Sequence, residues 1–308
     1  MTTKRTLGSV RDRVQAIWTA IPRTAGQRTR QMSVLAVVTG ATTGLAVAGF
    51  DRLVGTDLFD RALHAPLWLQ AGLPTVGLVI AALVLRTVGR GCSPSTADEY
   101  IRAFHDREGR LELRPIPARL LASAATLAAG GAMGFEGPSM YIGAGIGSWL
   151  QRRWSRAFSR EDSKLLMVCG AAAGVAAIFK APATGMVFAL EVPYRQDLAR
   201  RMLLPAMFSA AAGYVVFVAV NGTTPLFPIG SSPPFDLRDL GGAAVLGLLS
   251  GVGARGMARL LREAKGLAAE HSILVRLPVV AAVLVGVFAA TRGLTGQSLS
   301  LGSGYGAI

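Results

Sequence analysis

The chain has 308 residues, of which 51% are hydrophobic and only 16% are charged, and its formal net charge is +14. Soluble domains of this length carry more charge, so the composition argues against a soluble globular protein. The basic residues fall between apolar stretches and do not gather in one patch of the sequence, so we exclude nucleic acid as a partner.

The first segment, residues 1–31, is basic. Against the single acid Asp12 it carries the basic residues Lys4, Arg5, Arg11, Arg13, Arg23, Arg28 and Arg30. By the positive-inside rule, this predicts a cytoplasmic N-terminus. The apolar stretch that follows starts too late and is too long for a typical signal peptide, so it predicts a first membrane helix.

Long uncharged apolar stretches then follow one another along the chain. They cover residues 33–50, 65–85, 120–135, 165–179, 202–235, 240–254 and 277–291. A bilayer span needs about 20 apolar residues. We therefore predict an all-α polytopic protein of the cell membrane, with the bilayer as a partner. The shorter stretches predict broken or re-entrant helices that other helices surround.

Capping residues and prolines between these stretches predict where helices begin and end. Ser95 or Thr96 can cap a short helix, and the prolines at 115 and 117 lead into the next one. A further helix should run from Pro138 to Arg153, and another over 164–179 should be interrupted before Pro182. Residues 227–235 read as a loop, and the last helices are expected near 241–261 and 273–291.

Three glycine pairs have the spacing that lets helix backbones approach closely in lipid: Gly143/Gly147, Gly170/Gly174 and Gly247/Gly251. They predict dense helix packing and no binding site. The histidines, His64, His105 and His271, and the cysteines, Cys92 and Cys169, are scattered without metal-ligand spacing or a nucleophile–base pair. We predict no enzyme, no metal and no cofactor.

One carboxylate stands out. Glu136 is the only charged residue in "GAMGFEGPSMYIGAGIG", residues 131–147. A carboxylate inside a membrane costs about 2.5–3.5 kcal/mol, so it is expected to have a function. Gly137 and Pro138 predict a helix start, whose free N–H groups and dipole attract anions. Glu136 would then be a tethered anion that competes with a mobile one. The alternative is a helix cap at the water interface.

A second stretch, "GAAAGVAAIFKAPATGMVFALEVPYR" at residues 170–195, again places a small-residue helix before a break and a second helix with one acid, Glu191. Together the two stretches resemble the CLC family of chloride channels and chloride/proton exchangers. The family's G-[KR]-E-G-P motif matches Gly134-Phe135-Glu136-Gly137-Pro138. Its G-A-A-A-G motif with the following F-x-A-P matches 170–191 almost completely.

The resemblance implies a CLC-type inverted-repeat fold and roles for individual residues. Glu136 would be the gating glutamate, and the backbone amides of Phe135, Glu136 and Gly137 would line the anion sites. An alignment without gaps places Ser95 on the family's anion-binding serine, although an ordinary helix cap remains the alternative. Phe135 replaces the basic residue that the family carries there.

The resemblance also bears on proton coupling. Glu191 matches the first of two glutamates near the inner end of the proton path, and Val192 takes the place of the second, the internal proton-transfer glutamate. Valine holds no proton, so the sequence favours a channel-like chloride transporter. A chloride/proton antiporter that uses another group stays an alternative, as does a truncated membrane protein that transports nothing.

By this resemblance, residues 32–235 would form the first membrane repeat, and 236–308 would begin the second. The family's later G-x-F-x-P motif and the tyrosine of its last membrane helix have no match, so we expect a fragment, incomplete at its C-terminus. The expected partners are chloride or a similar small anion and, through helices that match 182–221, a second copy in a homodimer.

Overall fold

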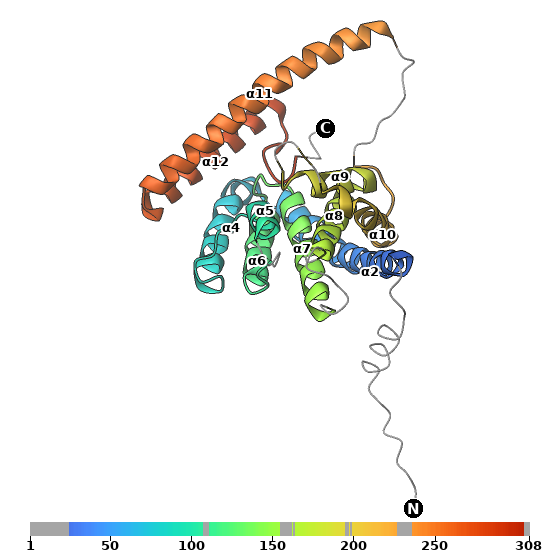
Figure 1. Ribbon diagram of the computed structural model, residues 1–308. Helices are drawn as coiled ribbons and strands as arrows, with labels where there is room; N and C mark the ends of the chain where they lie inside the picture. Colours follow the sequence, from blue (N-terminus) through green and yellow to red (C-terminus); the bar gives the residue numbers. More distant parts are fainter. Residues whose placement is uncertain are drawn as a thin grey trace, which may run out of the picture. The chain divides into compact units, whose positions relative to one another are not determined.

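The computed structural model describes residues 25–106, 111–154, 162, 164–194, 197, 199–226 and 236–304. All the elements found there are helices (Figure 1). The α-helices are α2 (Ala25–Asp51), α3 (Phe59–Leu63), α4 (Leu67–Thr87), α5 (Ala97–His105), α6 (Ile116–Ala128), α7 (Glu136–Arg153), α8 (Leu165–Phe179), α9 (Pro182–Glu191), α10 (Leu203–Asn221), α11 (Leu237–Glu270) and α12 (Ile273–Thr295). A π-helical segment, Arg52–Leu58, and a 3₁₀ turn, Arg200–Met202, complete the set. The all-α prediction is confirmed.

Most predicted elements appear close to their expected bounds. α8 coincides with the uncharged stretch 165–179, and α7 starts two residues before its expected first residue, Pro138. The stretch 120–135 is shorter as a helix than its apolar length suggested. α6 ends at Ala128 because Gly130 takes a left-handed conformation (φ 80°) and the Gly131 N–H donates to the Thr126 carbonyl at 2.8 Å. The loop expected at 227–235 lies outside the described residues, as does most of the basic N-terminal segment.

Five helical segments of the described chain are long and apolar enough to cross a membrane: Arg30–Leu63, Leu67–Thr87, Arg200–Asn221, Leu237–Leu267 and Val275–Thr295. Two apolar helices, Ile116–Ala128 and Leu165–Phe179, are shorter. At 1.5 Å per residue, α8 is about 22 Å long, less than the roughly 30 Å of a hydrocarbon core. Such a helix is expected to lie among other helices, as the sequence predicted.

Contacts divide the chain into two compact units. The first contains the described residues up to Gly49, together with Ser95–Ile116 and Glu136–Gly222; the second contains Phe50–Pro94, Pro117–Phe135 and the described residues from Thr223 onward. The first unit therefore holds α5 and α7–α10 with most of α2. The second holds α3, α4, α6, α11 and α12.

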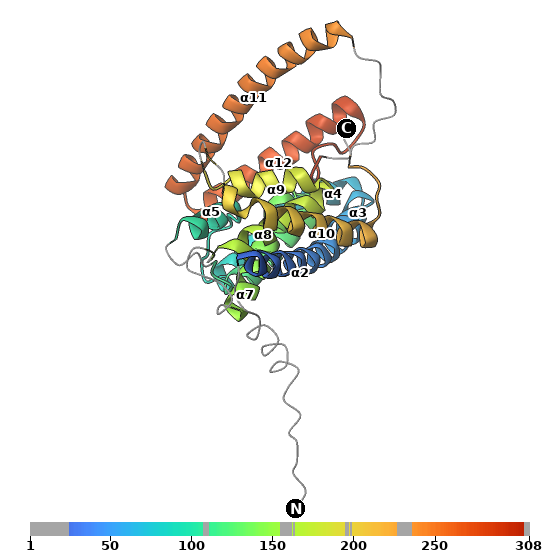
Figure 2. The same cartoon turned by 45° about the vertical axis from the view of Figure 1, so that its right-hand side comes forward.

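α8 is the central helix of the first unit. It contacts α7, α9 and α10 (Figures 1 and 2), and all but the last of its 15 residues are buried. Residues 169–177 of this helix are glycine, alanine, one cysteine and one valine, so neighbouring backbones approach it closely. The Ser209 hydroxyl of α10 donates to the Cys169 carbonyl of α8 at 2.8 Å. In lipid, close approach and interhelical hydrogen bonds stabilise such packing.

The contact between α7 and α8 is made by backbone. A Cβ atom added to Gly143 would lie 2.0 Å from the Gly170 carbonyl oxygen, and one on Gly147 would lie 1.8 Å from the Leu166 oxygen. A Cβ atom added to Gly174 would likewise lie 2.1 Å from the Ser139 carbonyl oxygen. The predicted role of these two glycine pairs is confirmed. The third pair, Gly247/Gly251, has no described neighbour within 4 Å of either added Cβ, so its predicted packing is not seen.

α8 ends where the sequence predicted an interruption. Lys180 adopts a left-handed conformation (φ 54°), and the Ala181 N–H donates to the Ala176 carbonyl at 3.1 Å. Pro182 then lies in the first turn of α9. Proline has no N–H to donate, so it suits a first turn and ends the preceding helix.

In the second unit, α4 packs against α12, and Gly77 of α4 approaches the Ala125 carbonyl of α6 so closely that an added Cβ would lie 2.6 Å away. The Gly302 N–H donates to the Gly130 carbonyl at 3.0 Å, which joins the turn after α6 to the segment after α12. α11 is different, because its apolar side chains, such as Leu248 and Val252, are more than 70% exposed. This unit is therefore packed mainly through its shorter helices and α12.

We predict that Gly147→Ala destabilises the protein by about 1–3 kcal/mol, because the new methyl group would force α7 away from the Leu166 carbonyl. The matched control is Gly251→Ala on α11, where the added methyl meets nothing within 4 Å. This control should be neutral or stabilising by up to about 1 kcal/mol through helix propensity. Thermal unfolding in detergent measures both variants, and equal melting temperatures would contradict the packing described here.

Candidate functional site

α7 begins at the lone carboxylate. Glu136 is its first residue and is half-buried, Gly137 is half-buried, and Pro138 is buried in the first turn. The first N–H groups of a helix have no acceptor within the helix, and they carry about half a positive charge. The start of α7 is thus suited to a carboxylate or a free anion. The Ser139 hydroxyl in this same turn is fully buried and has no hydrogen-bond partner in the described chain.

Phe135, which precedes Glu136, is an apolar residue in an apolar setting. It is 7% exposed, and its ring meets that of Phe50 edge to face, with centroids 6.2 Å apart. A Cβ atom on Gly55 would lie 3.1 Å from the same ring. The aromatic side chain therefore serves packing within the second unit, and position 135 supplies no positive charge.

Gly137 has a single close neighbour. The only atom within 4 Å of an added Cβ is the Thr96 hydroxyl oxygen, at 2.7 Å. Thr96 is the residue before α5 and is only 8% exposed. The structure therefore brings the hydroxyl of a mostly buried residue at the start of α5 to the start of α7, across 41 positions of the sequence.

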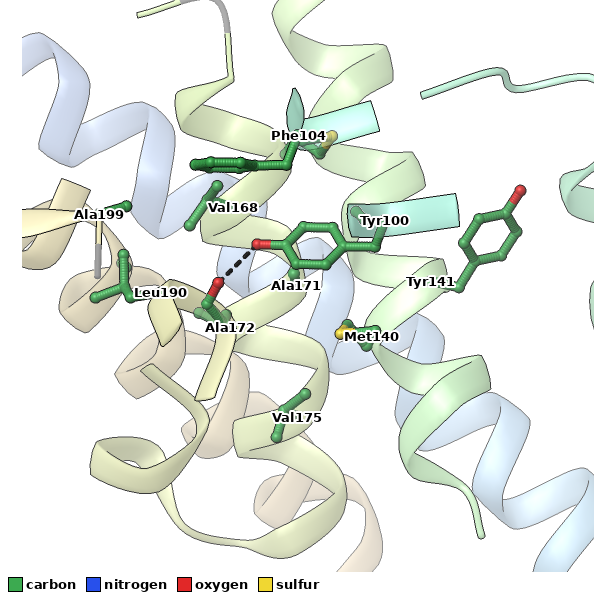
Figure 3. Packing of buried hydrophobic residues seen from close by; sticks show 14 of the residues in the cluster. Tyr100, Phe104, Met140, Tyr141, Val168, Ala171, Ala172, Val175, Leu190 and Ala199 are labelled. Carbon is green, nitrogen blue, oxygen red and sulfur yellow. Dashed lines mark hydrogen bonds between the residues drawn. The ribbon is translucent and has the colours of Figure 1, made fainter. Parts of the chain in front are cut away.

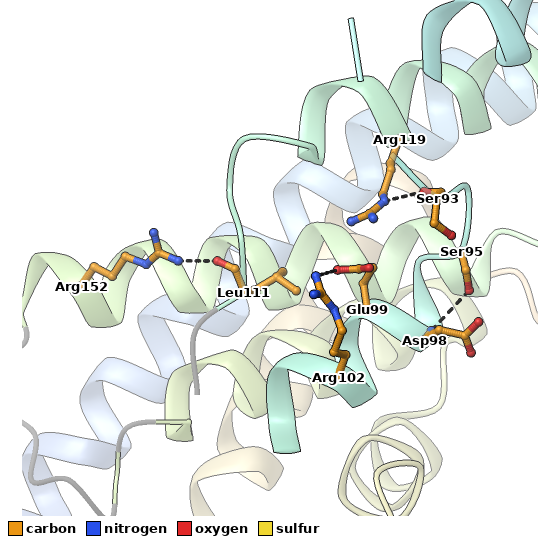
Figure 4. A network of polar contacts seen from close by, with 8 residues as sticks. All are labelled: Ser93, Ser95, Asp98, Glu99, Arg102, Leu111, Arg119 and Arg152. Carbon is orange, nitrogen blue, oxygen red and sulfur yellow. Dashed lines mark hydrogen bonds and ion pairs between the residues drawn. The ribbon is translucent and has the colours of Figure 1, made fainter. Parts of the chain in front are cut away.

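Ser95, the hydroxyl residue that the sequence singled out, is half-buried. Its oxygen accepts a hydrogen bond of 3.4 Å from the Asp98 N–H (Figure 4). Thr96 is the N-cap residue of α5, and no side-chain cap hydrogen bond is found at this helix start, so the cap role of Ser95 stays a prediction. Its role as an anion ligand also stays a prediction. The sequence indicated Thr96 only as the second of two possible caps for this helix.

α5 is held firmly against the core of the first unit. The Tyr100 hydroxyl donates to the Ala189 carbonyl of α9 at 2.8 Å, and complete burial of the ring raises the pKa of Tyr100 (Figure 3). On the outer side of the helix, Arg102 pairs with Glu99 at 2.6 Å, which raises the pKa of Arg102 (Figure 4). These contacts fix the helix that begins just after Thr96.

The end of α9 carries the second predicted group of residues. Glu191 is its last residue and is exposed, whereas Val192 is half-buried and packs against the buried cluster that contains Tyr100 and Leu190. Valine at this position contributes apolar contact. The Tyr194 N–H then closes the turn by donating to the Glu191 carbonyl at 2.8 Å.

A titratable residue that sequence analysis set aside lies beside this turn. His105, the last residue of α5, has its Nε2 atom 2.6 Å from the Pro193 carbonyl oxygen. A carbonyl only accepts, so Nε2 carries the proton. The imidazole also meets the rings of Phe104 and Tyr194, with centroids 5.5 and 6.1 Å away. Nothing in the spacing of the histidines indicated this contact.

Metal chemistry finds no support in the described part of the chain. It contains no group of three or more His, Cys, Asp or Glu side chains that could hold a metal ion. Cys92 and Cys169 are both free thiols.

The fold and the site define a polytopic membrane protein in which a half-buried carboxylate stands at the start of a buried helix. Comparison with protein families agrees, because the model of the voltage gated chloride channel family matches residues 76–308. The chain belongs to this family. The resemblance to CLC proteins and the prediction of a multi-pass membrane protein are thereby confirmed.

Some of its relatives are named as chloride channels, and others are named as exchange transporters. The putative chloride channel protein ClcB-like of Ralstonia nicotianae is 29% identical over 254 residues, which cover 76% of this chain and 57% of the relative. The H(+)/Cl(−) exchange transporter ClcA of Salmonella arizonae is 29% identical over 233 residues, which cover 71% of this chain and 48% of the relative. The chain thus spans about half the length of the curated relatives it matches.

Solved structures support the fold. A CLC-type fluoride/proton antiporter aligns with a TM-score of 0.76 at 24% identity, covering 91% of this chain and 69% of the other. A slow cyanobacterial Cl−/H+ antiporter aligns with a TM-score of 0.70 at 21% identity, covering 82% and 62%. At these identities the likeness establishes the CLC-type fold.

Proposed function

We propose that this protein transports chloride or a similar small anion across the cell membrane, with Glu136 as the gate. The observation that carries the proposal is the position of Glu136 as the half-buried first residue of α7, followed by Gly137, where an added Cβ would meet the Thr96 hydroxyl oxygen at 2.7 Å. Family membership supports it independently.

The physical basis is competition for one positive helix end. The N–H groups at the start of α7 attract the tethered carboxylate and a mobile anion alike. Protonation removes the charge of Glu136, so the carboxyl group no longer competes and the anion takes its place. Acid on the side that Glu136 faces should therefore open the pathway.

The other predicted site residues take supporting roles in this proposal. The backbone amides of Phe135, Glu136 and Gly137 line the anion path, and a hydroxyl from the start of α5 contributes a further donor. Gly134 and Pro138 shape the backbone before and after the gate. Because Phe135 replaces a basic residue, the path depends on helix dipoles and neutral donors.

We predict that Glu136→Gln makes anion flux less dependent on pH, because the amide mimics the protonated carboxyl group. Glu136→Ala should raise anion occupancy, because it removes the tethered competitor. The measurement is chloride flux from vesicles reconstituted with each protein across a pH series. If Glu136 only capped the helix, each change would cost about 0.5–2 kcal/mol of stability and leave the pH profile of flux unchanged.

Glu263→Gln is the matched control for this series. Glu263 lies on α11, pairs with Arg259 at 3.0 Å and has a side chain that is 61% exposed. The same loss of one carboxylate charge there should keep the parent pH profile. If both Glu136 variants also kept the wild-type pH dependence of chloride flux, Glu136 would not be the gate.

Val192 favours a channel-like mode of transport. We predict that a chloride gradient across vesicles holding the wild-type protein will not drive protons uphill at a fixed ratio, because position 192 holds no titratable group. A pH electrode in weakly buffered vesicles measures this directly. Sustained proton uptake at a constant chloride-to-proton ratio would refute the prediction.

A chloride/proton antiporter is the second candidate, and the His105 contact favours it. The imidazole lies against the carbonyl of Pro193, the residue after Val192, and an imidazole can take up and release a proton. If wild-type vesicles do move protons at a fixed ratio, His105→Gln should abolish the proton movement and retain chloride flux. His64→Gln is the control, because the His64 side chain is 77% exposed.

A membrane protein that transports nothing is the third candidate, because the chain spans about half the length of its relatives. Wild-type vesicles without any chloride flux, from protein that folds and melts cooperatively, would favour it.

We also propose a homodimer in which α9 and α10 face the second copy, and an N-terminus on the cytoplasmic side. These two helices contact each other, and each carries exposed apolar side chains: Val187 and Phe188 on α9, and Leu204, Met207 and Phe208 on α10. Exposed apolar patches of this kind suit either another subunit or lipid. Close packing against a second copy would make the surface sensitive to side-chain volume.

We predict that Phe208→Trp weakens the dimer, because overpacking a tight interface costs about 1–3 kcal/mol. The fraction of dimer in detergent, measured by light scattering against protein concentration, reports this change. Leu83→Trp on α4 is the control, since Leu83 is 56% exposed in the second unit. A wild-type protein of single-chain mass at every concentration would rule out the dimer.

A further inference from the structure

The helix α11 is longer than a bilayer is thick. It has 34 residues, about 51 Å at 1.5 Å per residue, whereas a hydrocarbon core measures about 30 Å. Even a tilt of about 40° leaves part of the helix outside that core. The uncharged stretch of α11 ends at Ala254, and residues 255–270 continue the same helix with charged side chains. This second half therefore lies at the membrane surface.

One face of the second half is basic. Arg255, Arg259 and Arg262 are spaced by four and three residues, so they project from the same side of the helix. All three are exposed, and with Glu263 they line a surface hollow of about 450 Å³. Glu263 pairs with Arg259 at 3.0 Å, whereas Arg255 and Arg262 form no ion pair with any residue of the described chain. The hollow is thus a cationic one.

The opposite face of the same segment is apolar. Met257, Leu260, Leu261 and Leu267 are 51–61% exposed. At 3.6 residues per turn they project from the side of the helix that faces away from the arginines. A basic amphipathic helix of this kind is typical of the membrane interface, where apolar side chains enter the acyl boundary and the cations reach the headgroups.

Further cations gather at this end of α11. Lys265 lies in its last turns, and the exposed Arg276 lies in the first turn of α12, which begins where α11 ends (Figure 1). The start of α11 carries one cation, Arg238, between the acids Asp236 and Asp239. By the positive-inside rule the end near Lys265 is cytoplasmic. The cytoplasmic leaflet holds anionic lipids, which attract basic segments beside a membrane helix.

We propose that residues 255–267 bind anionic phospholipids, with Arg255, Arg259 and Arg262 as ligands of the headgroup phosphate and the apolar face against the acyl chains. A guanidinium group binds two phosphate oxygens at once, which suits a phosphate ester better than a halide. The apolar face favours a lipid over free phosphate, because free phosphate would contact the arginines alone. This site is separate from the start of α7 and does not depend on anion transport.

The test is native mass spectrometry of the full chain in neutral detergent, titrated with phosphatidylglycerol or with phosphatidylcholine. The wild-type protein should bind phosphatidylglycerol at least about tenfold more tightly, because each cation near an anionic headgroup contributes about fivefold. The triple variant Arg255→Gln, Arg259→Gln, Arg262→Gln should lose this preference. Arg255→Gln alone should weaken phosphatidylglycerol binding about fivefold, and it replaces the triple variant if that protein does not melt cooperatively.

The matched control is the triple variant Arg52→Gln, Arg61→Gln, Arg238→Gln. It removes the same charge from three exposed positions that are distant in the sequence, and it should keep the preference within about twofold. Replacing both Leu260 and Leu267 by serine should weaken the binding of both lipids, because acyl contact is lost and the arginines remain.

Four outcomes would overturn the proposal. They are equal wild-type affinity for the two lipids, a preference that survives in the first triple variant, an equal loss in the matched control, and displacement of phosphatidylglycerol by millimolar inorganic phosphate. The last would assign the hollow to free phosphate. A wild-type mass of two chains that becomes one chain in the first triple variant, without bound lipid, would assign the face to a second copy.

Discussion

The structure of the first unit depends on the backbone contact between α7 and α8. Gly143 meets Gly170, Gly147 meets Leu166, and Gly174 meets Ser139, each at a distance that leaves no room for a side chain. Without a hydrophobic effect between helices in lipid, such close approach supplies much of the packing energy. It also fixes how far α7 can slide or rotate, and so it fixes where the helix begins.

The contact between α7 and α8 also positions the residues at the start of α7. Ser139, whose carbonyl faces Gly174 of α8, is three residues from Glu136, so the same interface that packs the helix also positions the carboxylate. Thr96 comes to Gly137 from α5, which is anchored through Tyr100 to α9 and thus to the same core. Under the proposed function, attraction for an anion there would come from dipoles and neutral donors, because the neighbouring side chain is the buried ring of Phe135.

The short helix α5 has a hydroxyl residue, Thr96, just before its start and a histidine, His105, at its end. It has nine residues, about 13 Å at 1.5 Å per residue. One end contacts the start of α7 at Gly137, and the other contacts the turn after α9 at Pro193. A change in anion occupancy at one end and a change in protonation at the other would act on the same rigid, anchored helix.

The sequence by itself determined the helices, because uncharged length, prolines and glycines are local properties. α8, the break at Lys180, the restart at Pro182 and the isolation of Glu136 all follow from such patterns. The use of two glycine pairs but not of Gly247/Gly251, the burial of Thr96 instead of Ser95 and the contact of His105 with Pro193 were decided only by tertiary structure. Each depends on how a helix is rotated against a segment that is distant in the sequence. A repeat or cap pattern holds no information about that rotation, which the packing of whole helix faces sets.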